Sequence, residues 1–141
     1  MKFDPKTLEE AVELLKAICP EESHVNDRGC TVSRGDDRFD GYNAYSRYTF
    51  DFTLCRLGWK QYDTRQDFEY FGMWFHPELL MTFNYCEGDL TLVVAPDAKC
   101  FQAEMEDAAE YYGKAPAIMW LLDDKGNLTG IIDSEARPTF D

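Results

Sequence analysis

The sequence predicts an α+β fold, in which an antiparallel, aromatic-rich sheet of about five to seven strands carries two packed helices. Short segments between residues 47 and 96 alternate apolar and polar side chains, which is the period of a half-buried strand. Segments with helical spacing of apolar residues lie on either side of this region. Of the 141 residues, 45% are hydrophobic and 15% aromatic, so we expect a single domain over residues 1–141 with a packed core.

Residues 4–19 are predicted to form the first helix. Asp4 can cap its N-terminus, Pro5 suits the first helical position, and Pro20 ends the helix. One apolar stripe runs along this segment at helical spacing, formed by Leu8, Ala11, Val12, Leu15 and Ile18.

Residues 20–46 are polar and contain several glycines, which predicts a long loop. A structureless loop of this length is uncommon in a compact domain. We therefore expect a short edge strand at residues 30–33, flanked by turns.

Four strands are predicted to follow one another at residues 47–57, 69–76, 79–86 and 90–95. In the first of them, aromatic and leucine side chains alternate with Thr and Asp, as in a half-buried strand. The second has apolar or aromatic residues on both faces. It is therefore either a central strand covered on both sides or a strand that uses one face for binding.

A second helix is predicted over residues 97–112, with Asp97 as its N-cap and Gly113 at its C-terminal end. Residues 117–133 are typical of a β-hairpin, because two apolar runs flank a polar turn that contains glycine. The polar residues 134–141 are expected to form a frayed tail.

The charge of the chain narrows its classes of partner. It has 27 acidic and 14 basic residues, a net charge of −13. Nucleic acids and anionic membranes are bound through Lys and Arg, so we expect direct contact with neither. Long-range attraction favours a basic protein partner instead. The alternative is that the acidity serves only to keep the protein in solution.

The five cysteines are widely spaced and odd in number, which argues against a disulfide framework. No apolar run approaches the roughly 20 residues of a membrane helix, and the N-terminus does not resemble a secretory signal. These features predict reduced thiols and a cytoplasmic location.

A distinctive series of motifs occupies the middle of the chain. It runs Trp59-Lys60-Gln61-Tyr62-Asp63-Thr64, Gln66-Asp67, Tyr70-Phe71-Gly72-x-Trp74 and Tyr85-Cys86-Glu87-Gly88-Asp89, followed by a helix that ends in Tyr111-Tyr112-Gly113. The series resembles small uncharacterised proteins of bacterial plasmids and phages. The resemblance implies a mobile-element origin and a single cytosolic domain, and it supplies no catalytic residues.

We therefore expect a non-enzymatic interaction protein without a cofactor. It would bind and inhibit or modulate a basic host protein that handles nucleic acid in defence, as anti-CRISPR and antirestriction proteins do. Trp and Tyr dominate interface energetics, and carboxylates in an ordered row can imitate a phosphate backbone. The candidate partner-binding residues are Trp59, Tyr62, Trp74, Glu104, Asp107 and Glu110. The aromatic rings can instead fill the second side of the sheet.

Two alternatives belong to other classes. A small metal-binding or enzymatic domain would use Cys19, His24 and Cys30, with His76 as a further ligand, although their spacing matches no standard zinc motif. The other alternative is a homodimeric accessory domain, with one aromatic face of the sheet buried between identical subunits. The sequence contains no nucleophile elbow and no phosphate-binding glycine loop, so we predict neither catalytic residues nor a bound metal.

Overall fold

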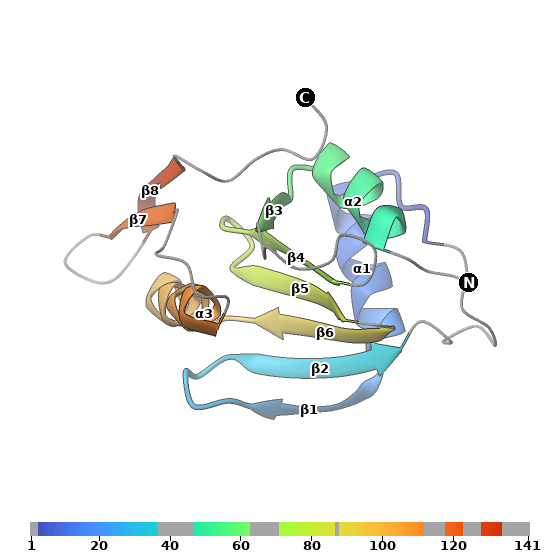
Figure 1. Cartoon of the computed structure of the whole chain (residues 1–141), viewed down its shortest axis with the longest axis horizontal. Helices are drawn as coiled ribbons and strands as arrows, with labels where there is room; N and C mark the ends of the chain where they lie inside the picture. Colours follow the sequence, from blue (N-terminus) through green and yellow to red (C-terminus); the bar gives the residue numbers. More distant parts are fainter. Residues whose placement is uncertain are drawn as a thin grey trace.

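A computed structural model describes residues 3–36, 47–62, 71–86, 88–111, 118–122 and 128–133. In this part of the chain it shows three helices and a six-stranded antiparallel sheet with an aromatic core, which confirms the α+β prediction (Figure 1). The elements are α1 (Leu8–Ile18), β1 (Glu21–Val25), β2 (Thr31–Asp36), α2 (Arg47–Arg56), β3 (Lys60–Tyr62), β4 (Phe71–His76), β5 (Met81–Cys86), β6 (Asp89–Val94), α3 (Ala98–Tyr111), β7 (Ile118–Leu122) and β8 (Leu128–Asp133).

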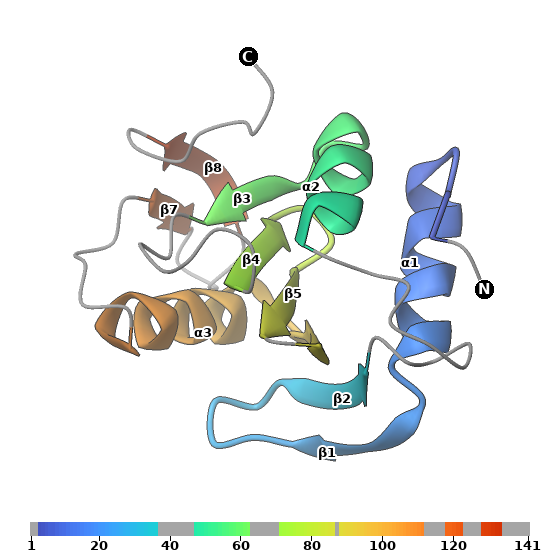
Figure 2. The ribbon, with the colours of Figure 1, turned by 45° about the vertical axis from the view of Figure 1, so that its right-hand side comes forward.

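The strand order of the sheet is β1-β2-β6-β5-β4-β3, and all neighbours are antiparallel. Helices α1 and α2 cover one face of this sheet, and α3 lies on the other (Figures 1 and 2). Strands β7 and β8 pair in a separate two-stranded hairpin, as predicted for residues 117–133. The predicted tail at 134–141 lies outside the described residues.

The face under α1 and α2 is built from aromatic rings. Phe50 of α2 lies at its centre, with ring centroids 4.8 Å from Phe83, 5.1 Å from Phe3, 5.9 Å from Tyr85 and 6.0 Å from Trp74. Such tilted pairs add to the stabilisation that burial of apolar area already provides. This face therefore holds the larger hydrophobic core.

Helix α1 begins later than predicted. Its N-cap is Thr7, whose Oγ1 accepts a hydrogen bond from the backbone N–H of Glu10 at 3.1 Å. The predicted cap, Asp4, instead pairs with Lys6 at 3.1 Å. Thr7 has extended backbone geometry, and the Glu10 carboxylate three residues on accepts the backbone N–H of Lys6 at 2.9 Å, one residue before the cap. The prediction of a helix from residue 4 is therefore wrong by one turn.

The predicted loop at residues 20–46 contains two full strands. Strand β2 lies between β1 and β6, in register from Thr31 opposite Val94 to Asp36 opposite Asp89, so the expected edge strand is internal. The turn between β1 and β2 is held by the side chain of Asn26, which accepts the backbone N–H groups of residues 28 and 30 at 3.0 Å. Residues 37–46 lie outside the described residues.

The predicted strand at 47–57 is the clearest error, because residues Arg47–Arg56 form helix α2. Phe50 and Leu54, one turn apart, are both fully buried against the sheet. Phe52, which strand alternation would place beside Phe50, is 50% exposed. The guanidinium of Arg56, one further turn along, lies 5.1 Å from the Phe52 ring centroid. The burial of residues four positions apart therefore determines a helix here, although the apolar residues of the segment also alternate as in a strand.

The predictions for the remaining strands of the sheet and for the second helix are confirmed. Strands β4 and β5 lie within the predicted segments and β6 begins and ends one residue earlier than predicted, so their boundaries shift by at most two residues. Helix α3 occupies the predicted second helix. Asp97 caps α3, since its Oδ1 accepts the N–H of Cys100 at 2.8 Å. Strand β4 is covered on both sides, with Trp74 in the aromatic core and Phe75 in the core beneath α3. No helix in the described ranges is long and apolar enough to cross a membrane.

The close approach of α1 to β2 gives a first prediction. A Cβ atom added at Gly35 would collide with the carbonyl oxygen of Ile18 and lie 3.0 Å from the Cα atom of Cys19. We expect Gly35→Ala to lower the free energy of unfolding by about 2 kcal/mol or more, because backbone cannot move aside cheaply. Urea denaturation measures the change, with Thr31→Ala, an exposed position on the same strand, as the control. Equal stabilities of the two variants would contradict this packing.

Candidate functional site

The structure corrects the exposure expected for two predicted aromatic anchors. Trp59 is 2% exposed and Trp74 is fully buried. The Trp59 ring packs edge-on against His76 at 5.8 Å, and the Trp74 indole donates a hydrogen bond to the buried carboxylate of Asp51. Both rings therefore lie in the interior, which agrees with the alternative that the aromatic rings fill the second side of the sheet. Tyr62 lies in β3, and its side chain is outside the described part of the structure.

The same burial removes the predicted dimer surface. The aromatic face of the sheet is covered by α1 and α2 of the same chain. A second copy would have to displace both helices to reach it. A homodimer built on that face is therefore inconsistent with this fold.

The predicted acidic row on α3 is also altered. Glu104 is largely buried and accepts hydrogen bonds from Arg28 Nε and from Asn26 Nδ2, the latter at 3.0 Å. Asp107 is exposed and lies 3.7 Å from Arg28 Nη2. The hydrogen bond to Glu104 raises the pKa of the Arg28 guanidinium above its ordinary value. Glu104 therefore holds the fold together rather than projecting a free charge. The side chain of Glu110 is outside the described part.

The predicted metal ligands do not converge. Cys19 belongs to the core beneath α1, Cys30 to the core beneath α3 on the opposite face of the sheet, and His24 is exposed on β1. Burial raises the pKa of each of the two thiols to about 12 and so favours their neutral form. No group of three His, Cys, Asp or Glu side chains within the described ranges can hold a metal ion. All five cysteines are free thiols.

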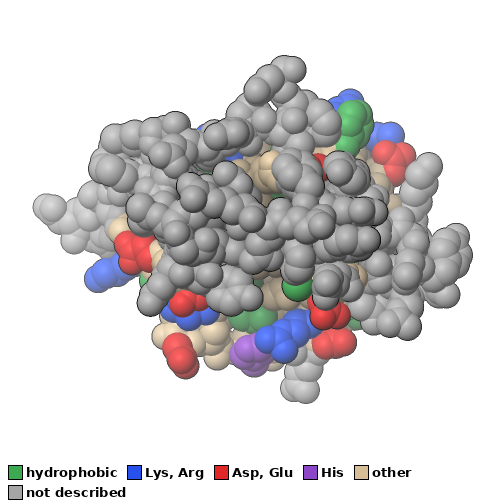
Figure 3. Space-filling view, in the orientation of Figure 1, with side chains coloured by type: hydrophobic (Ala, Val, Ile, Leu, Met, Phe, Trp, Pro, Cys, Tyr) green, Lys and Arg blue, Asp and Glu red, His purple; other side chains and the backbone are tan. Residues whose placement is uncertain are grey.

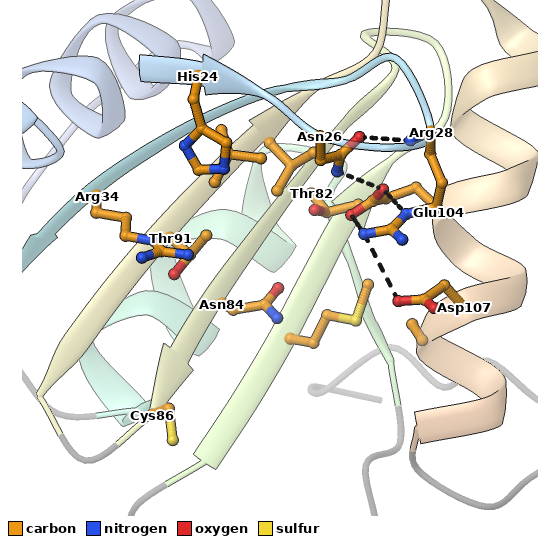
Figure 4. Close-up of a pocket in the computed structure, with 14 residues that line it drawn as sticks. His24, Asn26, Arg28, Arg34, Thr82, Asn84, Cys86, Thr91, Glu104 and Asp107 are labelled. Carbon is orange, nitrogen blue, oxygen red and sulfur yellow. Dashed lines mark hydrogen bonds and ion pairs between the residues drawn. The ribbon is translucent and has the colours of Figure 1, made fainter. Parts of the chain in front are cut away.

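A groove on the α3 face brings together polar groups that the sequence analysis did not combine. One row of residues in cross-strand register consists of Val32, Val93, Thr82 and Phe75. The apolar residues of this row belong to the same core as Phe101 and Met105 of α3. The next such row consists of Arg34, Thr91, Asn84 and Met73. Residues in register share a face, so this second row lines the groove beside the helix (Figure 4).

The groove has a volume of about 370 Å³, within the range of small-molecule sites. Side chains from β1, β2, β4, β5, β6 and α3 line it. In Figure 4 the side chains of Arg34, Thr91 and Asn84 extend from the strands into this space, and Asp107 faces it from α3. It is therefore a mixed site, with a cation on one side and a carboxylate on the other.

Two polar groups of the groove lack partners among the described residues. No hydrogen bond or ion pair joins the exposed Arg34 guanidinium to any of them. The Asn84 Oδ1 atom is buried and accepts no hydrogen bond from them either. A buried acceptor without a donor costs about 1–3 kcal/mol, so its retention on a sheet face calls for an explanation other than stability.

The wall opposite Arg34 is fixed by its own hydrogen bonds. Asn26 accepts two backbone N–H groups with its Oδ1 and donates to Glu104 with its Nδ2. Arg28 binds the same carboxylate, so the turn between β1 and β2 is tied to α3 (Figure 4). The charges of Glu104 and Arg28 largely cancel, and these bonds fix the position of this wall relative to α3.

Comparisons with protein-family models, with curated proteins and with solved structures found no match to this chain. Function is therefore inferred from the fold and the groove. The sequence does contain part of the signal, because Thr82 and Asn84 alternate with Met81, Phe83 and Tyr85 and must lie on the opposite face. Arg34 lies one residue beyond the short strand predicted at residues 30–33, and the sequence pattern does not indicate that this strand pairs beside β6.

The unpartnered amide gives a second prediction. Asn84→Leu removes a buried acceptor at nearly constant volume, so we expect the free energy of unfolding to stay unchanged or rise by up to about 1 kcal/mol. The matched control is Asn26→Leu, which breaks three hydrogen bonds and should lower it by about 1–3 kcal/mol. Urea denaturation compares the two. Equal destabilisation by both substitutions would show that Asn84 supports the fold.

His76 gives a third prediction, on pH. Burial lowers the pKa of its imidazole below the ordinary 6.5, although nearby Glu78 opposes the shift. The unfolded chain then binds a proton more tightly, so stability is lost as pH falls below 6.5. The Nδ1 atom accepts the N–H of Leu79 at 3.3 Å, a role that an asparagine oxygen can take. We expect His76→Asn to lose less stability than wild type between pH 7.5 and the folded-state pKa. Parallel losses in urea denaturation would contradict the buried neutral imidazole.

Proposed function

We propose that this chain is a non-enzymatic interaction protein of a mobile element, which binds a basic host protein through its acidic surface and inhibits or modulates it. The observation that carries the proposal is the outward-facing excess of carboxylates in a chain of net charge −13. Long-range attraction to such a surface speeds association with a basic protein and repels nucleic acid. A host protein that handles nucleic acid in defence fits, since such proteins present Lys and Arg to phosphates.

Several basic side chains already make contacts within the chain, which supports this proposal. Lys6 pairs with Asp4, Arg28 with Glu104, and Arg56 lies over the Phe52 ring. Acidic and basic side chains are interspersed around the described part of the face in Figure 3. Because several cations are already engaged within the chain, exposed carboxylates remain the groups most available to a partner.

Helix α1 offers the most ordered of these carboxylates. Glu9 and Glu13 lie one helical turn apart on its exposed side, and Glu10 lies between them. The buried stripe of the helix, at Ala11, Leu15 and Ile18, anchors it on the sheet. The carboxylates are thus held on a capped, packed helix, where binding requires little further ordering of the backbone.

The test is capture of host proteins by the tagged chain at low and at high salt, followed by affinity measurement with the purified partner. We expect a basic partner that is released by salt. Glu9→Gln combined with Glu13→Gln should weaken its binding about five- to tenfold, since each exposed pair contributes modestly. The matched control, Glu78→Gln with Asp89→Asn, changes net charge equally at two exposed positions on the sheet turns.

An acidic partner, or binding that high salt does not weaken, would contradict the proposal. Equal affinity of wild type and the α1 double variant would contradict the assignment of the surface to α1. Loss of binding in the control pair alone would place the contact at the β4–β5 and β5–β6 turns.

A further inference from the structure

We infer that the groove beside α3 is a binding site for a small dipolar ligand, with a carboxylate or phosphate at one end and an N–H donor at the other. The inference is independent of the proposed partner surface on α1, which lies across the opposite face of the sheet. It rests on the cavity, on the two groups in it that lack partners, and on the charge of the chain.

Arg34 supplies the site for the anionic end. Its guanidinium presents several N–H donors in one plane, which match the two oxygens of a carboxylate or phosphate. Arg28 and Arg56 are engaged by Glu104 and by the Phe52 ring, whereas no contact of this kind joins Arg34 to the described residues. In Figure 4 its side chain extends over Thr91 into the groove.

Asn84 supplies the site for the donor end. The side chain of Asn84 lines the groove, and its buried Oδ1 accepts no hydrogen bond from the described residues. Rotation of the amide can present this oxygen to a group in the groove that carries a hydrogen. Arg34 and Asn84 are each in register with Thr91 on the strand between them, so their backbones are about 10 Å apart. The long arginine side chain shortens this gap, and a ligand of amino-acid size can span it.

The rest of the groove favours a dipolar ligand over a simple anion. Asp107 faces the same space from α3 and can accept a further hydrogen bond from a cationic end (Figure 4). Val32, Val93 and Ala108 provide apolar contact for a short hydrocarbon segment. A chain of net charge −13 repels a free anion, whereas a ligand whose charges cancel escapes this repulsion.

The experiment titrates the isotope-labelled full chain with four probes by NMR in the millimolar range. The first, 4-aminobutyrate, carries both groups, whereas butyrate lacks the donor and butylamine lacks the anion. Phosphoethanolamine replaces the carboxylate by a phosphate, so comparison with 4-aminobutyrate tells which anion the site takes. We expect saturable shifts of the Arg34 Nε–H and the Asn84 side-chain amide with at least one dipolar probe, and none with butyrate or butylamine.

Two variants and a control test the residues. Arg34→Gln should weaken binding about tenfold, because a charge-assisted hydrogen bond is lost, and Asn84→Leu should abolish it. Lys16→Gln, which removes an exposed cation from α1, should leave affinity unchanged. The bound probe should also slow alkylation of Cys86, an exposed thiol that lines the groove.

The inference is overturned if neither dipolar probe gives saturable shifts at Arg34 and Asn84. It is equally overturned if butyrate and butylamine bind as well as the dipolar probes, or if Arg34→Gln retains wild-type affinity. Since Arg34 is exposed, its substitution leaves the fold intact, which an unchanged pattern of the other amide signals verifies.

Discussion

The hydrogen bond from the Trp74 indole to the Asp51 carboxylate joins helix α2 to the sheet, and the division of the molecule into two unlike faces depends on it. Both residues are almost completely buried. A buried carboxylate is costly unless it is hydrogen-bonded, so Asp51 is tolerated in this helix because the indole meets it. Gly72 leaves the space that the ring occupies, since a Cβ there would lie 3.0–3.1 Å from two of the ring's atoms.

Because α2 covers the aromatic face of the sheet together with α1, a partner can bind only at other surfaces of this fold. Phe50, carried by α2, meets four aromatic rings and is fully buried among them. On the second face α3 covers an apolar row and stops short of the polar row beside it, which forms the groove. The proposed partner surface on α1 and the proposed ligand site in the groove therefore both lie outside the aromatic core.

The sequence pattern predicted those helices and strands in which the spacing of apolar residues fits only one type of secondary structure. Strand β5 alternates apolar and polar side chains, and Asp97 marks the start of α3 because aspartate is a preferred N-cap residue. Helix α2 could not be recognised in this way, because Phe50 and Phe52 also fit a strand and the partner of Asp51 is 23 residues away. The sequence pattern indicated only part of the groove, namely Thr82 and Asn84. The sequence pattern did not indicate Arg34, the cation of the groove, because β2 is defined by its pairing with β6, which lies far along the chain.

A double-mutant cycle on Asp51→Ala and Trp74→Phe tests most directly whether the hydrogen bond between these side chains holds α2 on the sheet. If the carboxylate and the indole hold α2 on the sheet, the two substitutions should be non-additive in free energy of unfolding, with a coupling of about 1–3 kcal/mol. Additive effects, within about 0.5 kcal/mol, would mean that α2 is not held by this bond. The burial of Phe50 and Leu54 would then account for the position of α2 without this bond.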